Sequence, residues 1–77
     1  MFTVYIKSEV NLPASVRFIM DKVTHADGKC WEIRSVTKME WNPYAGGMDF
    51  FVLVNGTEKE FSLYGMSASD VFAVYPE

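Results

Sequence analysis

The sequence predicts one small α+β domain over residues 1–77, with elements in the order β-α-β-β-β-α. Three patterns support this class: a long alternating run, a hairpin turn between two strand-like runs, and one amphipathic stretch of helical period. Short connections make the last three strands an antiparallel meander. We expect the first strand at one edge of that sheet, and the two helices packed on the sheet.

The long alternating run covers residues 31–41, with the sequence WEIRSVTKMEW. Successive side chains of a strand point to opposite faces of the sheet. The predicted core face carries Trp31, Ile33, Ser35, Thr37, Met39 and Trp41. The predicted solvent face carries Glu32, Arg34, Val36, Lys38 and Glu40. We therefore expect Trp31 in the core and Trp41 at the start of the next turn.

The N-terminal third is expected to form a strand and then a helix. Residues 2–7 alternate between aliphatic or aromatic and more polar side chains, as in a strand. Residues 11–13, Asn-Leu-Pro, indicate a helix start, because Asn suits the cap and proline suits the first turn. The apolar residues that follow form one helical stripe: Leu12, Val16, Ile19, Met20 and Val23. A loop at residues 25–29 ends this helix.

The clearest local signal is Asn55-Gly56 between two β-rich runs, residues 48–54 and 57–64. Asn-Gly is the strongest short-range sign of a hairpin and favours a type I′ turn. A two-residue turn predicts that Val54 faces Thr57. The other predicted pairs are Val52 with Lys59, Phe50 with Phe61, and Met48 with Leu63. A three-residue turn would move each partner by one position and exchange the two faces of the second strand.

The C-terminal residues are expected to form a short helix. Residues 67–70, Ser-Ala-Ser-Asp, have the form of a capping box in which Asp70 replaces the commoner Glu. Val71, Phe72 and Tyr75 would then share one helix face, which Pro76 ends. A helix of two turns does not persist alone, so this one must dock on the sheet.

The composition excludes several classes of protein. Hydrophobic residues make up 49% of the chain and aromatic residues 16%, so some rings are expected to remain for a partner. The net charge is −3, and the excess acid lies after residue 40, which does not favour nucleic acid or membrane binding. The chain shows no basic leader and no long apolar run, and Cys30 is its only cysteine. These features predict a cytoplasmic protein without a disulfide.

The only histidine and the only cysteine, His25 and Cys30, lie close to Asp27 and Glu32. A Cys–His pair can supply a nucleophile and its base, but catalysis also needs an orienting group and an oxyanion site. The sequence shows no such set, so we expect no enzyme. One His and one Cys fall short of the four ligands of a structural zinc site, and no cofactor motif is present. We therefore expect neither a metal nor a cofactor.

Two surfaces are candidates for binding a partner. The loop at residues 41–47 carries Trp41 and Tyr44, and both ring types are favoured as interface anchors. The outer face of the hairpin combines two apolar residues with an acidic rim: Phe51 and Leu53 with Asp49, Glu58 and Glu60. The alternatives are that the two loop rings fold back onto the core, and that the C-terminal helix covers the hairpin face.

Our leading hypothesis is a small non-enzymatic protein that binds another protein, with a homodimer as one form of this. Small acidic α+β chains of this kind are typical of phage or mobile-element proteins that inhibit or redirect host machinery. A second hypothesis is a protein that sequesters a small molecule or nucleotide, with Trp41 and Tyr44 as stacking faces between subunits. A third is an enzyme that uses Cys30 and His25.

Overall fold

The fold is one antiparallel sheet of six strands, so the predicted α+β class with packed helices is wrong. A computed structural model describes residues 1–10, 12–25 and 28–77. The strands are β1 (Phe2–Lys7), β2 (Met20–His25), β3 (Gly28–Asn42), β4 (Gly47–Val54), β5 (Thr57–Tyr64) and β6 (Val71–Pro76). The helical elements of the described ranges are two short 3₁₀ segments, η1 (Ala14–Ile19) and η2 (Ala68–Asp70). Neither could cross a bilayer.

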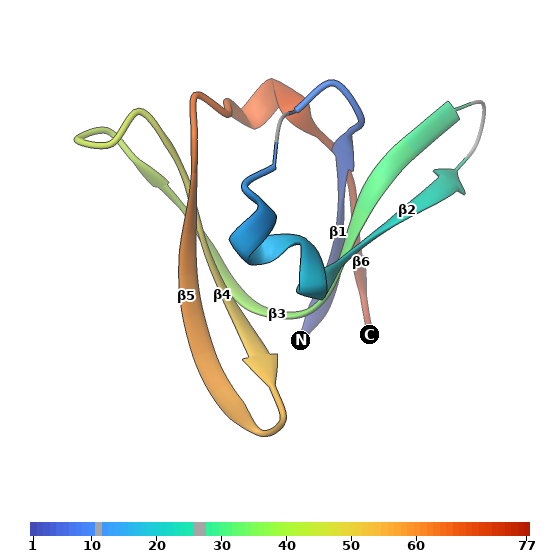
Figure 1. Ribbon diagram of the computed structural model, residues 1–77, viewed down its shortest axis with the longest axis vertical. Coiled ribbons are helices and arrows are strands. Elements are labelled where there is room, and N and C mark those ends of the chain that lie inside the picture. Colours follow the sequence, from blue (N-terminus) through green and yellow to red (C-terminus); the bar gives the residue numbers. More distant parts are fainter. Residues whose placement is uncertain (11, 26–27) are drawn as a thin grey trace.

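The strands lie in the order β5-β4-β3-β1-β6, and β2 pairs with β3. Residues 28–33 of β3 pair with β2, residues 30–36 pair with β1, and residues 36–42 pair with β4. β3 therefore joins the two halves of the sheet, which open as a V around η1 (Figure 1). The first strand lies between β3 and β6, which corrects the prediction that it occupies an edge.

A bend in β3 is centred on Ser35, which adopts a left-handed conformation with φ of 59°. Ile33 faces Val4 on the neighbouring strand, but Val36 faces Phe2. Three steps along β3 therefore match two steps along β1, and β3 has one extra residue. Such a bulge bends the strand and increases its twist.

A second extra residue follows within β3. Val36 faces Val52 of β4, whereas Lys38 already faces Phe51, so two steps along β3 match one step along β4. Between the two shifts Val36 turns into the core and is fully buried. The predicted alternation is therefore wrong at the centre of the run, where Ser35 had been assigned to the core face. After the second shift the original alternation returns.

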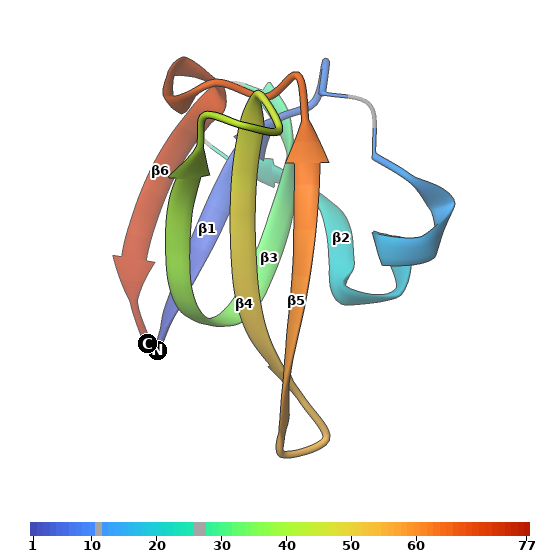
Figure 2. The ribbon, with the colours of Figure 1, turned by 90° about the vertical axis from the view of Figure 1, so that its left-hand side faces the viewer.

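The core fills the concave side of the sheet, and η1 covers the open side between the two halves of the V (Figure 2). Its buried apolar members are Val4, Ile6, Leu12, Val16, Met20, Ile33, Val36, Met48, Phe50, Val52, Leu63 and Met66. Phe50 is fully buried, and its ring stacks on that of Phe61 with 5.4 Å between centroids. Because burial of one such ring contributes about 2–3 kcal/mol, Phe50 is a main support of the fold.

The predicted hairpin register is confirmed. Val54 faces Thr57, and the pairs that follow down to Met48 with Leu63 are those expected from a two-residue turn. Asn55 and Gly56 have positive φ angles of 51° and 78°, which the type I′ turn requires. The local turn chemistry therefore decides this part of the structure.

The first predicted helix is wrong beyond its start. Residues 14–19 form the 3₁₀ segment η1, and residues 20–25 form β2. Met20 faces Ile33 and Val23 faces Cys30, so the ladder to β3 replaces the second half of the expected helical stripe. The predicted cap residue, Asn11, lies outside the described residues.

The second predicted helix is also wrong, because residues 71–76 form β6 and pair with β1. The run of β-branched and aromatic residues suits a strand, and a ladder to β1 supplies more hydrogen bonds than two helical turns. The predicted capping arrangement is present, since the Asp70 carboxylate accepts a hydrogen bond from Ser67 N–H at 3.0 Å. It caps a single 3₁₀ turn and not a helix.

Gly47 supports a test of the packing between β4 and β5. A Cβ atom at this position would lie 2.1 Å from the carbonyl oxygen of Leu63 and 2.8 Å from Cα of Tyr64. Gly47→Ala should therefore lower the free energy of unfolding by about 2–3 kcal/mol in urea denaturation. Gly28→Ala, where no atom lies within 4 Å, is the matched control and should change it by less than about 0.5 kcal/mol. Equal effects of the two substitutions would contradict this packing.

Ser35 supports a test of the bend. Ser35→Val should lower the free energy of unfolding by at least about 1 kcal/mol, because a β-branched residue does not tolerate a φ of 59°. Ser35→Gly removes this strain and should leave stability unchanged within about 0.5 kcal/mol, or raise it. A valine variant as stable as the glycine variant in urea melts would show that this residue is not held in the left-handed region.

Candidate functional site

Three exposed rings surround the end of the sheet where β3 turns into β4. Trp41 is 52% exposed, Tyr44 is 100% exposed, and Tyr64 is 71% exposed. Trp41 ends β3 beside Met48, Tyr44 lies in the turn, and Tyr64 ends β5 opposite Gly47. We name these three residues the aromatic tip. The turn projects from the body of the sheet at the upper left of Figure 1.

Hydrogen bonds fix the turn that carries Tyr44. The Asn42 side-chain oxygen accepts bonds from the N–H groups of Tyr44 and Ala45, at 3.0 and 3.1 Å. The Asn42 carbonyl accepts a bond from Gly46 N–H at 2.9 Å. Gly46 has a φ of 66°, and its carbonyl accepts a bond from Gly65 N–H on the neighbouring segment. The Tyr44 ring is thus exposed on a main chain that is already ordered.

The prediction left open whether the loop rings fold back onto the core, and their exposure answers this for Trp41 and Tyr44. Neither ring lines the hollow beside Cys30, the hollow between η1 and the hairpin, or the smaller one between Val10 and Tyr64. Trp41 follows the core-facing alternation of β3, whereas Tyr64 follows Leu63, which is buried, and so points to the opposite face. The rings therefore flank the tip on two sides and do not form a slot within one chain.

The outer face of the hairpin carries the remaining predicted contact residues. Phe51 and Leu53 are half-buried, and each lies opposite an acidic residue of β5, Glu60 and Glu58 respectively. The helix that was expected as a cover is absent, because β6 pairs with β1 on the other side of the sheet. No helix of the described residues therefore covers this face.

The protein's own polar side chains cover much of that face. The Lys38 ammonium lies 5.4 Å from the centroid of the Phe51 ring, and the Thr37 hydroxyl donates a 2.8 Å hydrogen bond to Glu58. Asp49 accepts hydrogen bonds from Asn42 at 3.1 Å and from Ser62. The hairpin face thus offers a partner less free apolar surface than its sequence indicates. Both oxygens of the Asp49 carboxylate already accept hydrogen bonds within the chain.

Sequence reasoning missed a second group of rings, on the outer side of the other half of the sheet. His25 lies at its centre, with its ring centroid 4.6 Å from Tyr5, 5.2 Å from Phe72 and 5.7 Å from Tyr75. We name these four residues the outer aromatic cluster. Its residues come from β2, β1 and β6, and two of those elements were expected to be helical. The β-branched and aromatic composition of residues 71–75 was the signal that could have revealed it.

Cys30 and Glu32 lie on the same outer side and are buried, with 2% and 7% exposed. Glu32 was predicted to face solvent; it forms an ion pair with Arg34 instead, with Nε 2.6 Å from Oε1. Burial, together with the Glu32 charge, raises the pKa of the Cys30 thiol, which disfavours the reactive thiolate. Asp27 lies outside the described residues. Within the described residues, no group of three acidic, His or Cys side chains could hold a metal.

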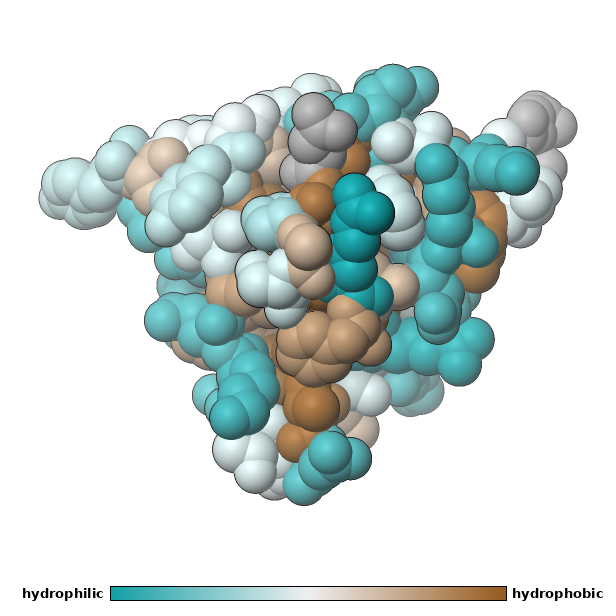
Figure 3. All heavy atoms as spheres, viewed as in Figure 1, coloured by the Kyte–Doolittle hydropathy of each residue, from teal (hydrophilic) through white to brown (hydrophobic). Residues whose placement is uncertain are grey.

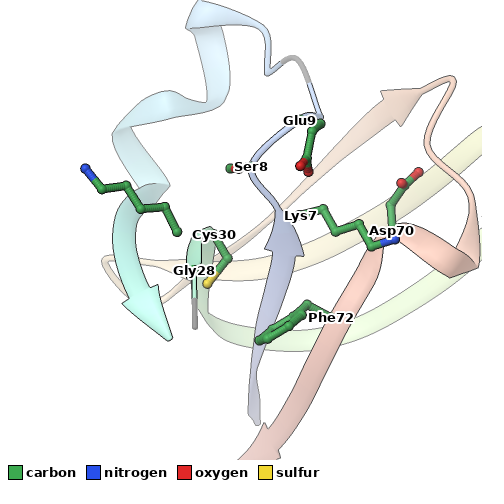
Figure 4. A pocket seen from close by; sticks show the side chains of 8 residues that line it. Lys7, Ser8, Glu9, Gly28, Cys30, Asp70 and Phe72 are labelled. Atoms are coloured by element: carbon green, nitrogen blue, oxygen red, sulfur yellow. The ribbon is translucent and has the colours of Figure 1, made fainter. Parts of the chain in front are cut away.

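An open hollow of about 480 Å³ lies beside Cys30, between the ends of β1, β3 and β6 (Figure 4). Its lining residues are Lys7, Ser8, Glu9, Gly28, Lys29, Cys30, Asp70 and Phe72. Two bases and two acids balance one another there, so charge does not select a ligand. A more apolar hollow of about 330 Å³ lies between η1 and the β4–β5 hairpin. Figure 3 shows hydrophobic surface, in brown, along this region.

Comparison with protein-family models found no match for this chain. Comparisons with curated proteins and with solved structures likewise found no significant match. Arguments about function therefore depend on the residues and their geometry.

The Cys30 thiol and the Tyr5 hydroxyl predict an alkaline limit to stability. The nearby Glu32 carboxylate raises the pKa of Tyr5, so the folded chain keeps both protons more tightly than the unfolded chain, which releases them near pH 9.0 and 10.0. The contribution of these two groups to the free energy of unfolding is complete below pH 9.0. It is lost as the pH rises through their raised pKa values. Urea midpoints measured across this range should fall less in a Cys30→Ala/Tyr5→Phe double variant. Parallel curves for the two proteins would contradict this linkage.

Proposed function

We propose that this protein acts by binding another protein through the aromatic tip. The observation that carries the proposal is the complete exposure of Tyr44 on a turn whose main chain is fixed by hydrogen bonds. A ring held in this way loses little conformational freedom when a partner covers it, so most of its burial energy is available for binding.

The chemistry of the tip supports a protein partner. Trp and Tyr are enriched among the residues that dominate protein interfaces, since each combines a large apolar area with one polar group. Trp41, Tyr44 and Tyr64 expose three such rings at one end of the sheet. A matching surface would hold an apolar socket for the Tyr44 ring.

The acidic side chains near the tip indicate the character of the partner's rim. Glu40 lies one residue from Trp41, whereas Glu60 and Glu58 are exposed farther along β5, toward the opposite end of the hairpin. Complementary charge at a rim mainly raises the association rate. Added salt screens the charges and reduces this gain. A partner with basic residues around its apolar socket fits this arrangement.

The other hypotheses have less support. A stacking site for a small molecule between subunits would need a second chain to complete it, because within one chain Trp41 and Tyr64 lie on opposite faces of the sheet and form no slot. An enzyme that uses Cys30 needs an accessible thiolate, whereas this thiol is 2% exposed and its pKa is raised.

Site-specific photocrosslinking tests the proposal. A photoreactive residue in place of Tyr44 should capture a defined protein from a lysate of the source cells, whereas the same residue at Thr57, on the far end of the hairpin, should not. With the purified partner, Tyr44→Ala should weaken binding about 30-fold, which corresponds to about 2 kcal/mol for an anchor residue.

Phe18→Ala is the matched control, because Phe18 is a ring with 72% exposure on a different surface. It should leave the affinity unchanged. An interaction that tolerates Tyr44→Ala and Trp41→Ala together but is lost in Phe18→Ala would refute the tip as the binding surface.

A further inference from the structure

Three strands of the described sheet have an unpaired edge, and they differ in how they are protected. β2 pairs only with β3 and carries Asp21 and Lys22. β5 ends one side and carries three consecutive charged residues, Glu58, Lys59 and Glu60. β6 ends the other side and has no charged residue from Val71 to Pro76. Charged side chains on an outer strand prevent other strands from adding to it, and β6 lacks this protection. Its exposed apolar residues are Phe72, Val74 and Tyr75, which are 46%, 45% and 48% exposed.

The register of β6 shows which main-chain groups are free. Glu77 N–H donates to the Met1 carbonyl at 3.1 Å, and Pro76 faces Phe2 in the same register. In an antiparallel ladder the N–H and C=O of one residue point to the same neighbour, and those of the next residue point away. The groups of Ala73, Tyr75 and Glu77 therefore face β1. The N–H and C=O of Val74 face the free edge, where Pro76 offers only a carbonyl.

We propose that a second copy of this chain adds to this edge, with the two β6 strands antiparallel about a two-fold axis at Val74. In this register Val74 faces Val74 of the partner subunit, and each donates one hydrogen bond to the other. Ala73 then faces Tyr75 of the partner subunit, so a small residue lies opposite a large one on the outer side. A two-fold interface uses the same patch twice, and this patch complements itself.

Charge bears on where a second copy can approach. A chain with a net charge of −3 repels another copy of itself over most of its surface. β6 itself carries no charged side chain, and the acids that flank it accept hydrogen bonds within their own chain: Asp70 from Ser67 N–H at 3.0 Å, and Glu77 from Ser35 N–H at 2.7 Å. The edge is therefore the part of the described surface where two copies can approach with least repulsion.

The outer aromatic cluster prepares the edge for pairing. The ring of Tyr75 lies 5.7 Å from the rings of both Tyr5 and His25, and Phe72 meets His25 edge-on at 5.2 Å. These contacts hold the strand in place before a partner arrives, so pairing orders few additional groups. Phe72 is able to reach His25 because a bulge in β6 makes it an extra residue between Val71 and Ala73.

The same features limit assembly to two copies. The bulge at Phe72 and the missing N–H of Pro76 confine the new ladder to the stretch around Val74. After pairing, the strands that keep a free edge would be β5 and β2 of each copy, and both carry charged residues. The result is a closed dimer and not an open fibre.

The test is sedimentation velocity on the full chain at concentrations up to about 1 mM, where even weak dimers are populated. The wild-type chain should dimerise. Val74→Lys and Val74→Glu should each weaken the dimer by roughly fivefold or more, because like charges would face each other at the axis. An equimolar mixture of the two variants should restore it, which also shows that both variants fold. Thr57→Lys, which adds the same charge to β5, is the control and should dimerise like the wild type.

Three results would overturn the proposal: a monomeric wild-type chain at all concentrations, undiminished dimers in both Val74 variants, or a mixture that stays monomeric while each variant alone is monomeric. Tyr44→Ala should retain the dimer, since the aromatic tip lies at the end of another pair of strands. Loss of the tip function and loss of the dimer are therefore measured separately.

Discussion

Pairing to β3 holds this molecule together. β3 forms ladders with β1, β2 and β4. β5 and β6 are each connected to it through one neighbouring strand. A straight strand of this length could not serve partners on both halves of a V-shaped sheet. The left-handed Ser35 and the two extra residues around it provide the bend, so the core depends on a short irregular segment inside its longest regular element.

The bend also determines which surfaces remain for partners. By closing the sheet around η1, it places most of the large aliphatic side chains on the concave side, where they are buried. The exposed rings are left mainly at the ends of the sheet, at the aromatic tip and along β6. On the hairpin face the second extra residue places Lys38 opposite Phe51, and this lysine shields the ring that sequence reasoning had taken as free.

Local chemistry could be predicted from the sequence, and pairing between distant segments could not. Asn55-Gly56 defines its own turn and register, so the hairpin was predicted pair by pair. The composition of the run from Val71 to Tyr75 suits a strand, but the capping box before it and its length also fit a short helix, and the ladder to β1 selects the strand. The candidate site shows the same division. Trp41 and Tyr44 were identified by residue type, whereas the β6 edge became visible only once that strand had its partner.

The hydrogen bond between Glu77 N–H and the Met1 carbonyl joins the residue before β1 to the residue after β6, and Figure 2 shows these two positions side by side. The connectivity of the chain could therefore be rearranged without changing its pairings. A short linker joining these two residues, with new termini opened between Asn55 and Gly56, would leave every strand of the sheet intact. The same adjacency means that a fusion partner attached at either end would lie close to β6 and would obstruct that edge, whereas new termini at the hairpin turn would leave it clear.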